Sequence, residues 1–147
     1  MSYETQNNCV QKNQKLVTEC YFESKRKSVN HVTGRKGEDK ADLYLKSKGF
    51  EIIQRNYRTR QGEIDIIATK GEFLVFVEVK TLPHGDTKTL EAVLGKIKRK
   101  RIVETAKYFM SKYRQYNDRY IRFDVIVVDM PGLPQIYHIE NAFSENM

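Results

Sequence analysis

Residues 61–80 read QGEIDIIATKGEFLVFVEVK, and they contain two runs in which apolar residues alternate with other residues. This period of two is typical of β-strands. Between the runs, Gly71 permits the positive φ angle that a tight hairpin loop needs. The stretch therefore predicts a β-hairpin, with a two-residue loop at Lys70-Gly71 or a four-residue loop at Thr69–Glu72.

The register of this hairpin decides which charged side chains share a face of the sheet. Both loops place Asp65 opposite Phe76 and Glu63 opposite Glu78. Asp65, Glu78 and Lys80 then point to one side, with Asp65 diagonal to Glu78. A three-residue loop would move Asp65 to the other face, so the shared face is a testable prediction.

Two carboxylates and a lysine on one face can serve metal-dependent chemistry. Asp65 and Glu78 repel each other unless a positive charge lies between them, and Mg²⁺ or Mn²⁺ suits carboxylate oxygens. Lys80 could orient a water molecule or stabilise negative charge that develops on a phosphate. The alternative is a solvated strand face, where a Glu78–Lys80 pair contributes at most ~1 kcal/mol. Because residues 73–79 are otherwise apolar on both faces, the metal site is favoured.

A third acid precedes the hairpin. Residues 35–48 predict a helix, since Ala41 and Leu45 recur at helical spacing and Gly49 offers a stop. Glu38 lies three residues before Ala41 and seven before Leu45, which directs its carboxylate toward the protein. Burying it without a partner would be costly, so it could complete the metal site. The simpler alternative is an ion pair between Glu38 and an Arg or Lys at the edge of the apolar stripe.

The remaining pattern predicts an α/β protein with a central mixed sheet flanked by helices. A strand candidate at residues 50–58 precedes the hairpin, and a turn-rich loop at 82–88 follows it. A long helix is expected from Thr89, its N-cap, to Tyr113. An apolar strand at 121–130 and a short edge strand at 135–140 complete the order helix, three strands, helix, strand.

Positive charge is concentrated in one part of the chain. Residues 81–122 contain 11 Lys and Arg against 4 Asp and Glu, a net charge of +7, which equals that of the whole chain. Such a concentration indicates a polyanion partner, with nucleic acid the commonest, although a solvated helix face has the same composition. The candidate phosphate contacts are Arg55, Arg58, Arg60, Lys96, Lys98, Arg99, Lys100 and Arg101.

Three further groups of side chains have two interpretations each. Glu63 could help to hold metal or Lys80, or be a solvated acid at the start of a strand. Asp124, within an apolar strand, is better explained as a buried structural acid than as a catalytic residue. The tyrosines between arginines could stack on unpaired bases, but such residues more often cap a core; they are Tyr113, Tyr116 and Tyr120.

Composition excludes several classes of protein. Cys9 and Cys20 match no zinc signature, and the three histidines are scattered, so a thiolate or imidazole site is not expected. There is no apolar run of ~18 residues and no signal pattern, which predicts a cytoplasmic protein without a membrane partner. Residues 1–33 are polar and aperiodic, and predict a flexible extension before a single domain at 34–147.

The motifs resemble a known family. Asp65, a spacer, then Glu78-Val79-Lys80 is similar to the PD-(D/E)xK nuclease signature, with Ile64 in place of the usual proline. More specifically, residues 34–130 resemble the YraN family of bacterial proteins. The shared segments are GRKGEDKA at 34–41, QRNYR at 54–58, QGEIDIIA at 61–68, FVEVK at 76–80, AKYFM at 106–110 and RFDV at 122–125.

The resemblance implies a restriction-endonuclease-like αβββαβ core close to that of Holliday-junction resolvases. It implies Asp65 and Glu78 as metal ligands, Lys80 as the catalytic lysine, and Glu38 as the helix glutamate of the resolvase group. One departure is Thr81, where the family usually has a basic residue beside the DNA.

The expected function is that of a Mg²⁺- or Mn²⁺-dependent endonuclease. Its substrate would be DNA, branched or otherwise structured, in recombination, repair or uptake. If paired strands are cut, a homodimer would supply two active sites. The alternative is a nucleic-acid-binding module of the same fold with little or no cleavage activity.

Overall fold

A computed structural model of the protein describes residues 32–146. Residues 36–146 belong to one compact unit. Nearly all of the predicted extension, with Cys9 and Cys20, lies outside the described residues, so that extension stays a prediction. Within residues 32–146, no helix combines the length and the hydropathy needed to cross a bilayer.

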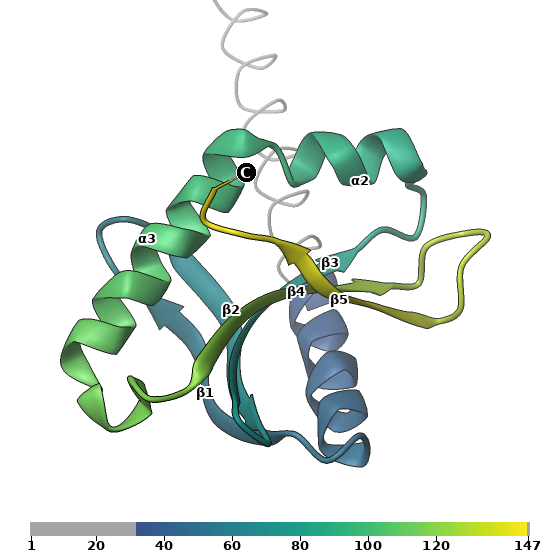
Figure 1. Ribbon diagram of the computed structural model, residues 1–147. Coiled ribbons are helices and arrows are strands. Elements are labelled where there is room, and N and C mark those ends of the chain that lie inside the picture. Colours follow the sequence, from purple (N-terminus) through teal and green to yellow (C-terminus); the bar gives the residue numbers. More distant parts are fainter. Residues whose placement is uncertain (1–31, 147) are drawn as a thin grey trace, which may run out of the picture. The chain divides into compact units, whose positions relative to one another are not determined.

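Helices and strands follow one another in the predicted order (Figure 1). The first helix begins at residue 32, three residues before the expected start at residue 35, one strand is longer than expected and one helix is divided. A helix over residues 32–47 comes first. It is followed by β1 (Glu51–Arg58), β2 (Glu63–Lys70), β3 (Phe73–Thr81), α2 (Thr87–Val93), α3 (Lys96–Lys112), a 3-10 turn (Arg114–Tyr116), β4 (Tyr120–Val128) and β5 (Ile136–Phe143).

The five strands form one mixed sheet in the order β1-β2-β3-β4-β5. Only β3 and β4 are parallel, because the chain crosses over through α2 and α3 between them; the other neighbours are antiparallel. This confirms the predicted α/β class and the restriction-endonuclease-like core. β5 extends to Phe143, beyond the short edge strand expected at 135–140.

The hairpin has a different register from the one predicted. Lys70 pairs with Phe73 and Ile67 pairs with Phe76, so the loop is Gly71-Glu72. Gly71 has a φ of 55°, in the left-handed region that this turn requires. Asp65 is therefore not opposite Phe76. Because the displacement is two residues and side chains alternate with a period of two, the predicted faces are unchanged.

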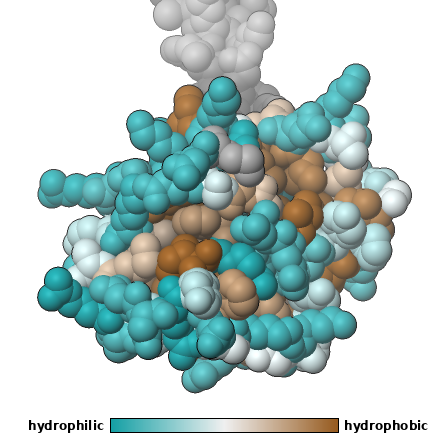
Figure 2. All heavy atoms as spheres, in the orientation of Figure 1, coloured by the Kyte–Doolittle hydropathy of each residue, from teal (hydrophilic) through white to brown (hydrophobic). Residues whose placement is uncertain are grey.

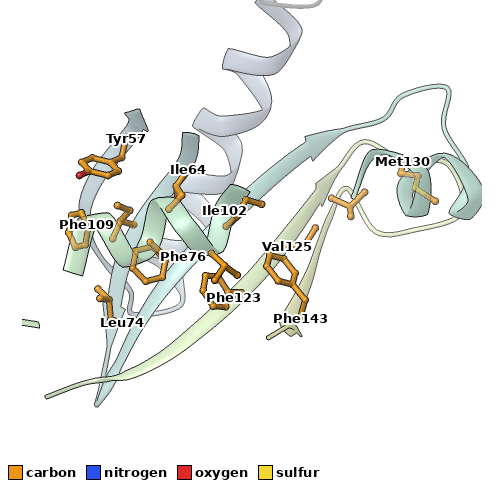
Figure 3. Packing of buried hydrophobic residues seen from close by; sticks show 14 residues of the cluster. Tyr57, Ile64, Leu74, Phe76, Ile102, Phe109, Phe123, Val125, Met130 and Phe143 are labelled. Atoms are coloured by element: carbon orange, nitrogen blue, oxygen red, sulfur yellow. The ribbon is translucent and has the colours of Figure 1, made fainter. Parts of the chain in front are cut away.

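The sheet is covered on both faces, which accounts for strands that are apolar on both sides. The helix over residues 32–47 packs Ala41 and Leu45 on one face, against Ile66, Val77 and neighbouring aliphatic residues. The other face holds an aromatic core centred on Phe109 of α3 (Figure 3). The ring of Phe109 lies edge-on to Phe76 at 5.9 Å between centroids.

The single helix expected from Thr89 to Tyr113 is wrong in two respects. It begins earlier, because the carboxylate of Asp86 accepts the Thr89 N–H at 2.8 Å and thereby serves as the N-cap. It is also divided, since Gly95 has a ψ of 167° and separates α2 from α3. The break gives α3 a start of its own, at Lys96.

Candidate functional site

Asp65 and Glu78 meet where the β2–β3 ladder ends. The last paired residues are Ile66 and Val77, so the next position on each strand places Asp65 directly across from Glu78. Beyond this last pair, β2 and β3 are joined by a side-chain hydrogen bond, in which Asp65 Oδ2 accepts the Val79 N–H at 2.7 Å. The two side chains are only 9% and 2% exposed. The acids are thus closer and more buried than the diagonal arrangement predicted.

Two lysines converge on one oxygen of Glu78. Lys80 Nζ lies 2.7 Å from Glu78 Oε1, and Lys98 Nζ from α3 lies 3.2 Å from the same atom. The contact with Lys80 agrees with the predicted common face. The contact with Lys98 was not predicted, since the sequence suggested only a phosphate contact for this residue. The sequence indicated the Lys98–Glu78 contact only weakly, because Lys98 lies near the start of a helix that packs on the same face of the sheet as Glu78.

Burial changes the acidity of Asp65. Removal from water, and then the neighbouring negative charge of Glu78, raise the pKa of Asp65 from 3.8 to about 7. The hydrogen bond from Val79 and the positive charge of Lys80 oppose this rise, whereas the charge of Glu38 adds to it. A carboxyl group with a pKa near neutrality is a feature of functional sites.

Glu38 reaches the same region from the helix over residues 32–47. Its side chain is 17% exposed, and its Oε2 lies 3.7 Å from Arg55 Nη2. The helix comes close to the end of β3, because a Cβ on Gly37 would overlap Thr81 Oγ1 and lie 3.2 Å from Thr81 Cβ. Gly37 therefore permits the approach that brings the next residue, Glu38, toward the acids of the hairpin.

Arg55 is held by acids of this helix. Its guanidinium contacts Asp39 at 2.7 Å and Asp42 at 3.2 Å, in addition to the longer contact with Glu38. The interpretation of Arg55 as a phosphate contact finds no support in this geometry. The carboxylates of Glu38, Asp39 and Asp42 all face the guanidinium of Arg55 on β1, and their negative charges attract it. The ion pair that the sequence predicts as the alternative for Glu38 is present with Arg55, at the long distance of 3.7 Å.

Within the described residues, three carboxylate oxygens are buried without a hydrogen-bond partner, namely Glu38 Oε2, Asp42 Oδ1 and Glu78 Oε2. Arg55 lies 3.7 Å from the first and Lys46 lies 2.9 Å from the second, so Glu78 Oε2 is the least compensated of the three. Leaving such an atom unsatisfied costs free energy, and a hard cation would satisfy it. Within the described part of the chain, however, no three His, Cys, Asp or Glu side chains are close enough together to hold a metal ion. Asp65, Glu78 and Glu38 therefore share a region without forming a closed cage.

The other basic residues differ in exposure. Arg58 pairs with Glu63 at 3.2 Å, which supports the interpretation of Glu63 as a solvated acid. Arg60, Lys96, Lys100 and Arg101 are exposed, and Arg99 is half-buried. In Figure 2, elongated hydrophilic side chains project from the part of the surface that α3 occupies in Figure 1. The first turns of α3 thus carry several exposed basic side chains.

Asp124 is a structural acid, as the sequence suggested. It is fully buried, and its carboxylate accepts from Arg122 at 2.8 Å and the Asn141 N–H at 2.9 Å, and lies 2.7 Å from the His138 ring. These partners hold the pKa of Asp124 below its ordinary value although burial opposes this. The acid joins β4 to β5.

Two of the three tyrosines cap the aromatic core. The ring centroids of Tyr113 and Tyr116 lie 4.5 Å and 6.0 Å from that of Phe109. Tyr120 is 65% exposed, and its ring lies 5.9 Å from that of Phe73. The core interpretation thus holds for the first two.

Known proteins resemble most of this chain. The sequence profile described as "Uncharacterised protein family UPF0102" matches residues 37–128. A UPF0102 protein of Treponema denticola is 44% identical over 123 residues, covering 76% of this chain and 95% of the relative. One from Geobacter metallireducens is 43% identical over 115 residues, covering 78% and 93%. The matched region contains the hairpin acids, Lys80 and Lys98, and the chain belongs to family UPF0102, the YraN family that its motifs resemble.

Proposed function

We propose that the protein is a divalent-metal-dependent endonuclease that hydrolyses phosphodiester bonds of structured DNA. The observation that carries the proposal is the pair of buried acids, Asp65 and Glu78, facing each other beside Lys80. Burying two carboxylates together is unfavourable unless a cation shares them. An ordinary structural role would not require both.

The carboxylates would hold the cation, and Glu78 Oε2, which is buried without a hydrogen-bond partner, suits that task. Glu38 Oε2, which also faces Arg55 at 3.7 Å, would be a further oxygen ligand. Asp65 has one oxygen engaged by the Val79 N–H, which fixes the direction of the other. When bound, Mg²⁺ or Mn²⁺ would supply an acidic water and charge neutralisation at the phosphate.

Lys80 is placed to act beside the acids. Its ammonium, 2.7 Å from Glu78 Oε1, would stabilise the negative charge that develops on the phosphate oxygens. The exposed basic residues of α3 would hold the strand by its phosphates. Arg60, exposed after β1, would extend this surface beyond the hairpin.

A second candidate function is that of a nucleic-acid-binding module without cleavage. It is favoured by the absence, within residues 32–146, of three ligating side chains close enough together to hold a metal. In this alternative, the lysines on Glu78 would neutralise the buried acid permanently. The basic surface would act in the same way under both proposals.

A cleavage assay tests the proposal. Linear, flapped and four-way-junction DNA would be incubated with the protein in Mg²⁺, Mn²⁺ or EDTA. We expect metal-dependent cutting, reduced by roughly 10²-fold or more in Lys80→Ala. Lys88→Ala, which removes an exposed lysine of α2, is the matched control and should cut normally.

The outcomes separate the two candidates. Cutting that survives Lys80→Ala would reject the role assigned to that lysine. DNA binding without cutting under all conditions would favour the binding module. Cutting that persists in EDTA would reject the metal.

A further inference from the structure

Glu78 is contacted unequally at its two oxygens. Oε1 is contacted by both Lys80 and Lys98, at 2.7 and 3.2 Å, whereas Oε2 is buried without a hydrogen-bond partner. Two ammonium groups on one oxygen repel each other, and one contact would suffice to neutralise the carboxylate. The second lysine therefore requires an explanation.

The two lysines differ in their freedom to leave. Lys80 lies two residues from Glu78 on β3, so the pleat keeps its side chain on the same face of the sheet. Lys98 comes from the first turn of α3, and its contact with Glu78 is the longer one, at 3.2 Å against 2.7 Å, although the two lysine side chains are about equally exposed, at 27% and 24%. Its flexible stem can carry the ammonium into solvent without movement of the helix. Lys98 is thus the exchangeable partner of Glu78.

The charges around the site favour such an exchange. Counted as ionised, Asp65 and Glu78 balance Lys80 and Lys98, and Glu38 is paired with Arg55. A divalent cation would add two positive charges, which repel the two ammonium groups on Glu78. A phosphodiester, with one negative charge, would offset part of this excess and provide Lys98 with a new partner.

We propose that Lys98 occupies Glu78 in the metal-free protein and transfers to a DNA phosphate when a divalent cation binds at that carboxylate. This inference rests on the proposed function of the site. Lys98 competes with the cation for one oxygen, so it lowers metal affinity while DNA is absent. Once released, it becomes a phosphate contact. Metal and DNA therefore favour each other's binding, and the coupling is reciprocal.

Direct measurement of Mn²⁺ binding by electron paramagnetic resonance, without DNA, tests the competition. We expect Lys98→Met to tighten Mn²⁺ binding by at least about fivefold, at the lower end of typical coupling. Lys100→Met removes the same charge from an exposed position on α3, and should change the affinity by less than about twofold because salt screens it. Lys98→Arg keeps a cation at Glu78 and should resemble wild type.

The second measurement adds four-way-junction DNA in which phosphorothioate linkages suppress cleavage. DNA should raise the Mn²⁺ affinity of the wild-type protein by at least about fivefold, and most of this rise should be lost in Lys98→Met. A merely structural role of Lys98 would change the thermal midpoint, but would not remove the coupling alone.

The failures are distinguishable. If wild type binds Mn²⁺ and Lys98→Met binds it equally or more weakly, the exchange is rejected and the proposed nuclease site stands. If DNA raises the affinity of Lys98→Met as much as that of wild type, the transfer to phosphate is rejected. If wild type binds no Mn²⁺ at all, the metal site and the exchange both fall.

Discussion

Replacing Asp65 by Asn should stabilise the metal-free protein above neutral pH. The amide keeps an oxygen that can accept the Val79 N–H, so the hydrogen bond at the end of the ladder is retained. What the substitution removes is a charge that is buried beside Glu78. Asn is close to Asp in volume, so packing should change little.

The magnitude follows from the pKa of Asp65, which burial raises from 3.8 to about 7. Below pH 3.8 the group is protonated in both states and does not affect stability. Between pH 3.8 and 7 the folded state binds more protons, so the free energy of unfolding falls as the pH rises. At about 1.4 kcal/mol for each unit of pKa, the loss amounts to about 4 kcal/mol above pH 7.

Urea denaturation followed by circular dichroism, in EDTA from pH 5 to pH 8.5, measures this loss. The difference in free energy of unfolding between Asp65→Asn and wild type should grow through this range and level off above pH 7. Mn²⁺ should then stabilise wild type more than the variant. A difference that is constant with pH, or a variant less stable than wild type at pH 8 in EDTA, would refute the reasoning.

Three further substitutions test how the site is positioned and which cations contact DNA. Gly37→Ala should lower the free energy of unfolding, because the added Cβ overlaps Thr81 Oγ1. In a Thr81→Ala background, the same substitution should leave the free energy of unfolding unchanged or raise it by up to ~1 kcal/mol. If the effects of the two substitutions are additive in the double-mutant cycle, the close approach of Gly37 to Thr81 is contradicted. Arg55→Ala should lower the thermal midpoint, since it leaves the helix acids unpaired, without changing the salt dependence of DNA affinity measured by fluorescence anisotropy. Lys100→Ala should instead lower the magnitude of the slope of log affinity against log salt concentration by about 0.9. If Arg55→Ala and Lys100→Ala give equal slopes, the assignment of Arg55 to a structural role and of Lys100 to a phosphate contact is rejected.

The face of the hairpin could be predicted because it depends only on parity. Asp65, Glu78 and Lys80 share a side under any loop with an even number of residues, and the observed turn at Gly71-Glu72 preserves this although it moves the register. Glu38 was directed inward for a similar reason, as a helix repeats its faces every three to four residues. The common face of the hairpin residues and the inward direction of Glu38 are local properties of the backbone, so the order of residues alone is enough to predict them.

The contacts between segments far apart in the sequence depend on the tertiary structure. Lys98 reaches Glu78 because Gly95 restarts the helix and the aromatic core fixes α3 over the sheet, and no local period encodes that approach. Arg55 was assigned to phosphate from charge alone, yet packing places the helix acids around it. A side chain's charge can be read from the chain, but its partner depends on distances between segments far apart in sequence. Only packing of the two layers on the sheet sets those distances.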